Sequence, residues 1–182
     1  DLDNIAHIYG TESVQYHEHI NKIDDFIKKI SKNNKLVIFS DHGMVDVNKI
    51  VKFHIESLLG KVSTNSYTFF LDSTFLRIWL HNKNLKSKII SILKTLDHGL
   101  VVDDDERKEY SFGNSDFGDI IFRANESVMY VPNFFGSRSC KAMHGYDPKL
   151  ESQKAFLAHN FNTDFSVACS SDVYHFLKKS LN

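Results

Sequence analysis

Apolar residues recur at helical spacing in the first part of the chain, over residues 11–33. The positions that set this pattern are Val14, Ile20, Ile23, Ile27 and Ile30. Because intervals of three and four residues return to the same face of an α-helix, the segment is predicted to be an amphipathic helix. Thr11 or Ser13 is placed to cap its start, and Asn33-Asn34 is placed to end it.

The predicted helix is followed by KLVIFS, residues 35–40, which is an unbroken apolar run apart from its ends. Its length and its β-branched residues are typical of a buried parallel strand. A helix followed closely by such a strand is half of an α/β unit. The pattern therefore predicts an α/β fold with a mostly parallel sheet and flanking helices.

The middle of the chain has a different pattern, in which short strands come in pairs. Residues 66–73 and 75–81 predict two strands around a tight turn, and residues 118–124 and 127–133 predict a second hairpin. The remaining predictions are a helix over Leu85–Leu96, a solvated loop in the acidic run 101–109, a strand at 154–159 and a final helix capped by Asp172. A hairpin-rich insertion at about 62–133 thus interrupts the α/β pattern.

Composition fits an ordinary globular protein and removes several classes of function. The 182 residues are 42% hydrophobic and 25% charged, with a formal net charge of −1, so nothing indicates binding to a nucleic-acid duplex through a broad positive field. No apolar run approaches the ~18 residues of a transmembrane helix. Cys140 and Cys169 offer neither a disulfide framework nor a thiolate zinc site, and their oxidation state stays open.

The stretch SDHGM, residues 40–44, places a carboxylate and an imidazole directly after the predicted strand. In an open α/β sheet, ligands bind beyond the carboxyl ends of the strands, which is where Asp41 and His42 are expected. Both side chains can ligate a divalent metal, and Gly43 allows the backbone to turn away. An ordinary polar turn is the alternative interpretation of this motif alone.

Two other patches carry similar chemistry. Asp3 and His7 are four residues apart, so on a helical turn they share a face and can chelate one ion. His144 precedes a glycine in the loop MHGYDP. A surface Asp–His pair is the ordinary interpretation of the first patch, and a structural or surface residue is that of a lone histidine. The other seven histidines receive this second interpretation: 17, 19, 54, 81, 98, 159 and 175.

The order of these patches resembles the alkaline phosphatase superfamily, and more closely its type I phosphodiesterase / nucleotide pyrophosphatase branch. Its recurring elements are Asp-x-x-x-His-x-x-Gly, a strand that ends in Ser-Asp-His-Gly-Met, and a later His-Gly-Tyr or His-Gly-Phe followed by Asp. This chain has DNIAHIYG, SDHGM and HGYD in the same order. The helix between the first two motifs and the closing segment DVYHFL also fit, so the resemblance spans nearly the whole chain.

The resemblance implies two divalent metal ions held roughly 4 Å apart, bridging one phosphoryl group. Asp3, His7 and His144 match the three ligands of one ion, and Asp41 and His42 match two ligands of the second. A ligand set of nitrogen and oxygen without thiolate suits Zn²⁺, with Mn²⁺ or iron as alternatives.

The resemblance also implies an alkaline-phosphatase-like fold and hydrolysis of phosphodiester or nucleotide pyrophosphate bonds through a Thr or Ser phospho-enzyme. In the family, that nucleophile and a further Asp ligand come earlier in the chain, and no residue here matches either. The chain also opens on Asp-Leu-Asp without a helix cap. We therefore expect residues 1–182 to be the C-terminal part of a single catalytic domain, incomplete at its N-terminus and inactive alone.

The expected partner is a phosphate-ester small molecule such as a nucleotide, whereas the natural substrate, compartment and oligomeric state stay open. Two alternatives remain for the function. The same metal ligands would serve a phosphonate hydrolase or a phosphomonoesterase of the superfamily. A partial copy without its nucleophile would serve as a binding module, although five intact ligand positions argue against long decay.

Overall fold

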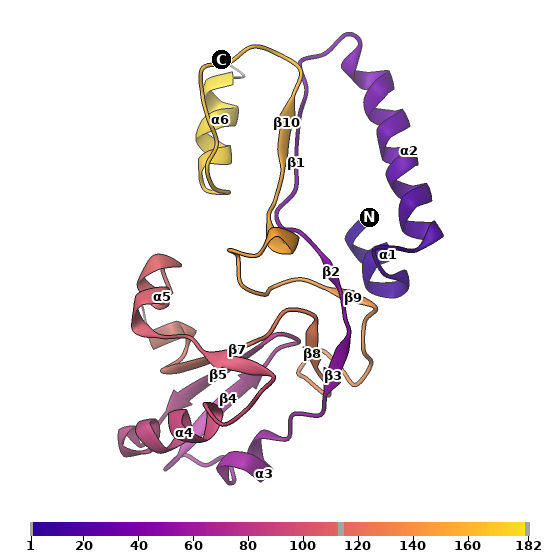
Figure 1. Ribbon diagram of the computed structural model, residues 1–182. Helices are drawn as coiled ribbons and strands as arrows, with labels where there is room; N and C mark the ends of the chain where they lie inside the picture. The colour runs from indigo at the N-terminus through magenta and orange to yellow at the C-terminus, as the bar shows by residue number, and fades with distance from the viewer. Residues whose placement is uncertain (1, 113–114, 181–182) are drawn as a thin grey trace.

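The fold divides into a closely packed sheet region and a more open arrangement of helices and paired strands (Figure 1). The computed structural model describes residues 2–112 and 115–180. The sheet region lies at the bottom of Figure 1, and the open region, with both ends of the chain, lies above it. None of the helices described has the length and apolar character needed to cross a membrane.

The sheet region is built on four antiparallel strands in the order β4-β5-β7-β6. Their bounds are Tyr67–Leu71 for β4, Phe75–Leu80 for β5, Ile120–Ala124 for β7 and Gly99–Val101 for β6. Along β5, every second side chain is buried, as expected for a strand with one face on a core. The predicted hairpin at 66–73 and 75–81 is confirmed, since β4 pairs with β5 from Tyr67 opposite Leu80 to Leu71 opposite Leu76.

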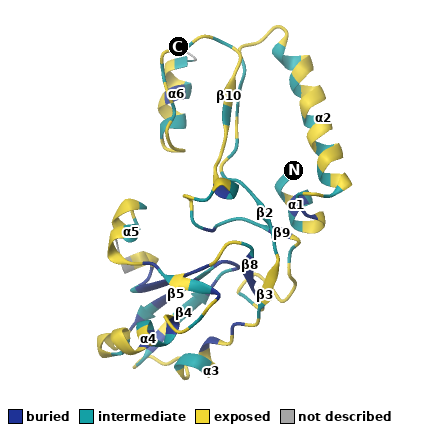
Figure 2. Ribbon diagram, in the orientation of Figure 1, coloured by how far each residue is buried: buried dark blue, intermediate teal, exposed yellow. Residues whose placement is uncertain are grey.

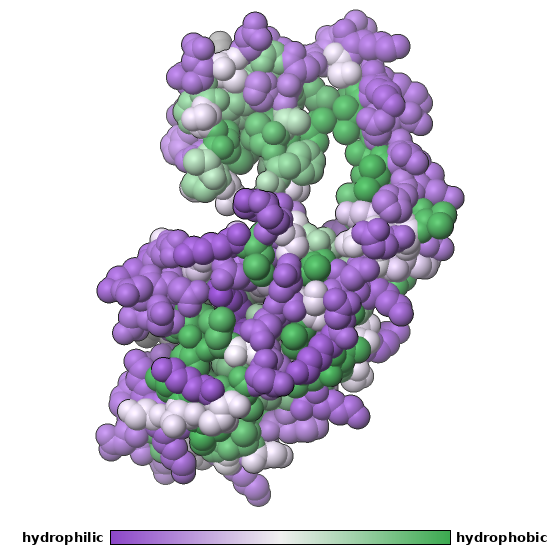
Figure 3. Space-filling model, viewed as in Figure 1, coloured by the Kyte–Doolittle hydropathy of each residue, from purple (hydrophilic) through white to green (hydrophobic). Residues whose placement is uncertain are grey.

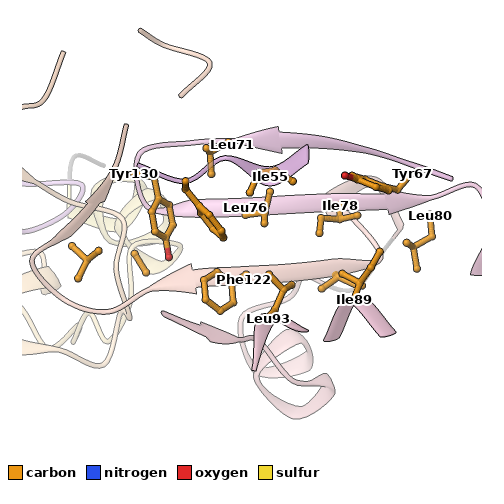
Figure 4. Packing of buried hydrophobic residues seen from close by; sticks show 14 of the residues in the cluster. Ile55, Tyr67, Leu71, Leu76, Ile78, Leu80, Ile89, Leu93, Phe122 and Tyr130 are labelled. Carbon is orange, nitrogen blue, oxygen red and sulfur yellow. The ribbon is translucent and has the colours of Figure 1, made fainter. Parts of the chain in front are cut away.

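One face of this sheet is covered by two helices, α3 (Ile55–Leu59) and α4 (Lys86–Leu93). The helix predicted over Leu85–Leu96 is therefore confirmed, with a short 3-10 turn, η1 (Lys83–Leu85), before it. Figure 4 shows the apolar side chains that meet between the helices and the sheet. They include Ile55, Tyr67, Leu71, Leu76, Ile78, Leu80, Ile89, Leu93, Phe122 and Tyr130. Because each large apolar side chain contributes about 1.5–3 kcal/mol when buried, this cluster is the main source of stability.

A histidine completes one edge of this core. His98 is only 9% exposed, and its ring packs edge-on against Phe53, Phe122 and Tyr130. Its Nδ1 atom lies 3.3 Å from the hydroxyl of Tyr130. Burial lowers the pKa of His98, with Lys49 adding to this effect and Asp97 opposing it. His98 therefore has the structural role that the sequence predicted.

The open region contains α1 (Leu2–Tyr9), α2 (Val14–Ser31) and α6 (Asp172–Ser180) around two two-stranded ladders. These ladders pair β1 (Val37–Phe39) with β10 (Leu157–His159) and β2 (Val45–Asp46) with β9 (Ala142–Met143). A third ladder, β3 (Lys49–Val51) with β8 (Val128–Tyr130), adjoins the sheet region, and every residue of β8 is buried. No residue of α2 is buried, and Figure 2 shows how burial concentrates in the sheet region instead. Apolar side chains accordingly reach the surface of the open region (Figure 3).

The helix predicted from Thr11 to Asn33 is confirmed, and its two ends follow from side chains. The Ser13 hydroxyl accepts a hydrogen bond from the backbone N–H of Tyr16, which caps the start of α2. At the other end, the side-chain amide of Asn34 donates to the carbonyl of Ile30 at 2.8 Å.

The strand predicted at 154–159 and the closing helix are also present, as β10 and α6. Asp172 is the first residue of α6, and its carboxylate accepts from the N–H groups of Ala168 and Cys169, which precede the helix, rather than from the first turn as the predicted cap would.

The prediction of a mostly parallel sheet is wrong for the sheets that this chain forms. The strand predicted at 35–40 is β1, and its ladder with β10 runs antiparallel; only β3 and β8 are parallel among the strand pairs described. A parallel neighbour needs a crossover connection that returns the chain to the same end of the sheet. Here the strand beside β1 is β10, which runs in the opposite direction. Phe39 of β1 is 50% exposed.

Two predictions in the middle of the chain also need correction. The segments 118–124 and 127–133 do contain strands, but β7 and β8 are not a hairpin, because both edges of β7 are already paired with β5 and β6. The acidic run 101–109 is not a loop. It contains the end of β6 and a helix, α5 (Asp104–Glu109), whose start is capped by the Asp103 carboxylate. Acidic residues in the first turn and basic residues in the last stabilise such a short helix.

The turn between α1 and α2 is tied to β2 by one carboxylate. Asp46 Oδ1 accepts hydrogen bonds from the backbone N–H of Thr11 at 2.7 Å and from its hydroxyl at 2.9 Å. Gly10, which ends α1 with a φ of +91°, faces the same carboxylate. These bonds help to fix where α1 lies relative to the strand ladder.

The buried His98 predicts a pH dependence of stability. Because its pKa is lower in the folded than in the unfolded state, the unfolded state binds more protons, and stability should fall as pH drops below about 6.5. The slope from this residue is at most about 1.4 kcal/mol per pH unit. Urea denaturation between pH 5 and pH 8 should show a smaller slope for His98→Gln than for the unsubstituted protein, and equal slopes would contradict the prediction.

Replacement of Asp46 should loosen the attachment of α1. We expect Asp46→Ala to lower the free energy of unfolding by about 1–3 kcal/mol, because the Thr11 N–H loses its partner. Asp46→Asn keeps an acceptor oxygen and should cost clearly less. Urea denaturation of the two variants measures the difference, and equal losses would show that the oxygen at this position does not matter.

Candidate metal centre

Three separate segments of the chain meet at the ladder of β2 and β9. Asp41 and His42 lie in the connection between β1 and β2, and His144 follows β9 directly. The helix α1, which carries Asp3 and His7, lies beside this ladder (Figure 1). Its last turn is fixed to β9, because the N–H of Lys141 donates to the carbonyl of His7 at 2.8 Å. All five residues singled out by sequence are thereby brought to one side of the ladder.

The carboxylate of Asp3 lies between two imidazole rings. Its Oδ1 atom is 3.4 Å from Nε2 of His7 and 3.7 Å from Nε2 of His144. Among the residues that the structure describes, this buried oxygen has no hydrogen-bond partner. A buried carboxylate oxygen without a partner is costly, so its position fits a cation held between these three side chains.

Two of the rings are oriented by backbone carbonyls. Nδ1 of His7 lies 2.8 Å from the carbonyl oxygen of Ala142, and Nδ1 of His42 lies 2.9 Å from that of Gly43. A carbonyl oxygen can only accept, so each Nδ1 is placed to donate, and in the neutral form of such a ring the lone pair lies on Nε2. This arrangement is how proteins commonly prepare histidines for metal binding.

His42 and His144 stack on each other, with ring centroids 3.8 Å apart and an angle of 19° between the planes. One ligand atom each from Asp3, His42 and His144 lie within 4.8 Å of one another. Burial lowers the pKa of His144, and the nearby His42 lowers it further. The neutral ring that results is the form of histidine that binds a metal.

Asp41 lies at the margin of this cluster. Its side chain is 86% exposed, and Oδ2 is 3.5 Å from Nε2 of His42. The five side chains therefore form a continuous series of contacts that runs from Asp41 through His42, His144 and Asp3 to His7. The family resemblance assigns His42 to a different ion from Asp3 and His144, whereas the tightest group of atoms includes all three. The assignment of individual ligands stays a prediction.

Glycine at position 43 is required by close packing rather than by a special backbone angle. A Cβ atom there would lie 2.1 Å from the carbonyl oxygen of Ser152, in the short helical turn η3 (Glu151–Gln153). The N–H of Gly43 donates to the carbonyl of Gln153 at 3.1 Å. Gly145, by contrast, has a φ of +83° and turns the chain sharply after His144. Both glycines thus serve to bring chain segments close beside a candidate ligand.

Hollows flank Asp41 on two sides. One, of about 270 Å³, is lined by Leu2, Asp3, Ala6, Tyr16, Ser40, Asp41, His42, Gly43, Met44, Lys154 and Phe156. Another, of about 450 Å³, adjoins Ser40 and Asp41 from the side of β10. Sequence reasoning did not identify Tyr16, Lys154 and Phe156 as neighbours of the site, because no motif marks them. Burial raises the pKa of Tyr16, so its hydroxyl stays protonated.

The chain is similar to known proteins both in sequence and in structure. The sequence profile of the type I phosphodiesterase / nucleotide pyrophosphatase family matches residues 1–147. No curated protein sequence matches the chain significantly. Among solved structures, human ectonucleotide pyrophosphatase / phosphodiesterase 5 is similar with 24% identity and a TM-score of 0.72 over 100% of this chain and 52% of its own.

Two further structures are similar to nearly the whole chain. An inactive variant of the murine ectonucleotide pyrophosphatase / phosphodiesterase 5, in complex with AMP, has 21% identity and a TM-score of 0.72 over 99% of this chain and 51% of its own. Phosphonoacetate hydrolase from Sinorhizobium meliloti 1021, in complex with phosphonoacetate, has 15% identity and a TM-score of 0.74 over 99% and 50%. This chain therefore spans about half the length of these proteins.

The structural similarities support the fold, and the sequence profile supports the family. The profile covers all three regions from which the candidate ligands come, including His144. By this match, the chain belongs to the type I phosphodiesterase / nucleotide pyrophosphatase family of the alkaline phosphatase superfamily.

Proposed function

We propose that the protein is a metal-dependent hydrolase of phosphodiester or nucleotide pyrophosphate bonds. Residues 1–182 would form the C-terminal part of its single catalytic domain, with residues 62–133 as a hairpin-rich insertion. Family membership supports the class of reaction. The observation that carries the proposal is the buried Oδ1 of Asp3, which lies without a hydrogen-bond partner between His7 and His144.

The donor set fits two divalent cations. Asp3, His7 and His144 would hold one, and Asp41 and His42 would supply ligands to the second. Nitrogen and oxygen donors without a thiolate suit Zn²⁺, with Mn²⁺ or iron as alternatives. When bound, such ions neutralise the negative charge that develops on the phosphoryl oxygens during transfer.

The residues of this chain prepare the site for such a substrate. Nδ1 of His7 and Nδ1 of His42 each lie within hydrogen-bond distance of a backbone carbonyl, an arrangement that directs Nε2 of each ring toward a ligand position. The exposed side chain of Asp41 marks the side that is open to a phosphate ester. We infer that a Thr or Ser from the part of the domain before residue 1 attacks phosphorus as the ester oxygen leaves. Water then hydrolyses the phospho-enzyme.

Two of the similar proteins suggest the class of substrate. The murine protein is bound to AMP, which favours a nucleotide, and the bacterial one is a phosphonoacetate hydrolase bound to phosphonoacetate, which keeps phosphonates as an alternative. We therefore propose a nucleotide-like phosphodiester or pyrophosphate as the substrate. A phosphomonoester is a further alternative, and a partial copy that only binds its ligand is the non-enzymatic one.

A panel of substrates tests the reaction class. The protein with its complete catalytic domain should hydrolyse a nitrophenyl phosphodiester with a higher kcat/KM than nitrophenyl phosphate or phosphonoacetate, whereas residues 1–182 alone should be inactive. A preference for phosphonoacetate would establish a phosphonate hydrolase instead. No turnover of any substrate by the complete domain, despite bound metal, would favour the binding module.

Removal of single ligands tests the metal centre. His144→Ala and Asp41→Ala should each lower turnover by more than roughly 100-fold, because the ions carry the charge of the transition state. His144→Ala should also reduce the amount of bound metal, measured by atomic absorption after gel filtration.

The control for these variants is His81→Ala. His81 is exposed at the end of β5, and we expect its replacement to leave both metal content and turnover unchanged. If His81→Ala is as damaging as His144→Ala, the wrong histidines have been chosen. If chelators leave the activity of the unsubstituted protein untouched, the metal-dependent mechanism is wrong.

A further inference from the structure

A buried arginine lies beside the loop that carries His144. Arg123 is on β7 and only 3% exposed, and its Nη2 atom is 2.6 Å from Oδ2 of Asp147 and 3.1 Å from Oε1 of Glu106. A buried charge of this kind is stable only when it is paired and hydrogen-bonded. Arg123 therefore joins three elements that are distant in sequence: β7, α5 and the loop after β9.

Asp147 is held by three donors. Besides Arg123, the hydroxyl of Tyr110 donates to its Oδ1 at 3.1 Å, and so does the backbone N–H of Lys149 at 2.9 Å. Burial alone would raise the pKa of Asp147, but the Lys149 N–H and the charge of Arg123 outweigh it and hold that pKa below its ordinary value. The carboxylate is thus kept ionised and in one place.

Only two residues separate Asp147 from His144, and both are fixed. The N–H of Tyr146 donates to the side-chain oxygen of Gln153 at 3.1 Å, and its hydroxyl donates to the carbonyl of Val128 at 3.1 Å. Gly145 has a left-handed backbone, and a Cβ atom there would lie 3.0 Å from Oγ1 of Thr74, in the β4–β5 turn. The two residues that connect the ion pair to His144 therefore have little freedom to move.

On its other side, His144 is held by β9, which pairs with β2 and contacts α1. The ring thus has two anchors. One is the ladder that also carries Asp46 and the end of α1, and the other is the ion pair with the sheet region. Loss of the ion pair would leave the contacts of Tyr146 as the main support on that side, so the ring could shift relative to Asp3 and His42, the two side chains that share its candidate metal site.

We propose that Asp147, held by its ion pair with Arg123 and its hydrogen bond from Tyr110, is a positioning residue. It would set the affinity for a metal ion at the site that includes His144. The inference rests on the proposed function, and it gives the segment 62–133 a definite role, since Arg123, Tyr110 and Glu106 all belong to it. The residues act through the backbone of the loop and do not themselves face the metal.

The test measures metal affinity in the folded protein. Zn²⁺ affinity is determined by competition with a chromophoric chelator, and folding is monitored in parallel by circular dichroism. We expect Asp147→Asn to weaken Zn²⁺ binding roughly 10- to 100-fold, the range seen when residues that orient metal ligands are replaced. Tyr110→Phe removes a single hydrogen bond and leaves the ion pair intact. It should weaken binding by up to roughly 10-fold, and it keeps the test decisive if Asp147→Asn does not fold.

The matched control is Asp119→Asn. Asp119 is also a partly buried carboxylate of the sheet region, paired with Lys83 at 2.6 Å and accepting the N–H of Leu80 at 2.7 Å. Its replacement should lower stability and leave Zn²⁺ affinity unchanged. In the His144→Ala background, Asp147→Asn should have no further effect on the remaining metal, because the ring through which it acts is gone.

The outcomes separate the two proposals. Tight Zn²⁺ binding that both Asp147→Asn and Tyr110→Phe leave unchanged would overturn the positioning role alone. So would a loss of affinity in Asp119→Asn as large as that in Asp147→Asn, because it would reflect general destabilisation. If the unsubstituted protein binds no divalent metal, the proposed function is wrong and this inference fails with it.

Discussion

The antiparallel pairing of β2 with β9 is the contact on which the candidate metal centre depends. Val45 pairs with Met143, and Asp46 pairs with Ala142. In this register, the residues just before β2 and just after β9 lie at the same end of the ladder, which places His42 beside His144. A shift by one residue would turn every side chain of the shifted strand to the opposite face. The ladder is only two residue pairs long, so it needs support from both sides.

That support comes from two regions with different packing. On one side, the four-stranded sheet has a large buried core, and Arg123 and Tyr146 connect it to the loop of His144. On the other side, α1 is held by hydrogen bonds to β9 and by the link between Asp46 and Thr11, while α2 buries no side chain. The centre therefore lies at a boundary between a well-packed region and a sparsely packed one. Asp3 and His7 have weaker support than His144.

Much of the local structure could be predicted from sequence because it depends on short-range patterns, whereas the grouping of the five candidate ligands could be predicted only from the family resemblance. Helix α2, the hairpin of β4 and β5, and the short strand β1 before the SDHGM motif follow from periodicity and capping residues such as Ser13. The direction of strand pairing could not be predicted. The pairing of β1 with β10 is set by residues more than 100 positions apart, and an apolar run such as KLVIFS fits parallel and antiparallel neighbours equally well.

Other features were missed because their signal lies in tertiary contacts. The sequence predicts a loop where α5 forms, since a run of charges has no apolar face, although Asp103 is a good capping residue. Arg123 looks like an ordinary strand residue in the sequence, and only the fold shows that Asp147 and Glu106 neutralise it. The glycine of SDHGM was correctly singled out, but its reason, the approach of Ser152, is not visible in the sequence.

The spacing around Asp3 fits a cation better than a proton as the partner of its buried oxygen. A protonated His7 or His144 would donate a hydrogen bond to Oδ1, but the separations of 3.4 and 3.7 Å are longer than such bonds, and burial lowers the pKa of His144. With metal–ligand bonds of about 2.0–2.2 Å and a tetrahedral angle, oxygen and nitrogen ligands of one zinc ion lie about 3.4 Å apart. The observed separations are close to that value. Protonation would also use the Nε2 lone pairs that a cation needs, and the lowered pKa of His144 favours the ring that keeps its lone pair.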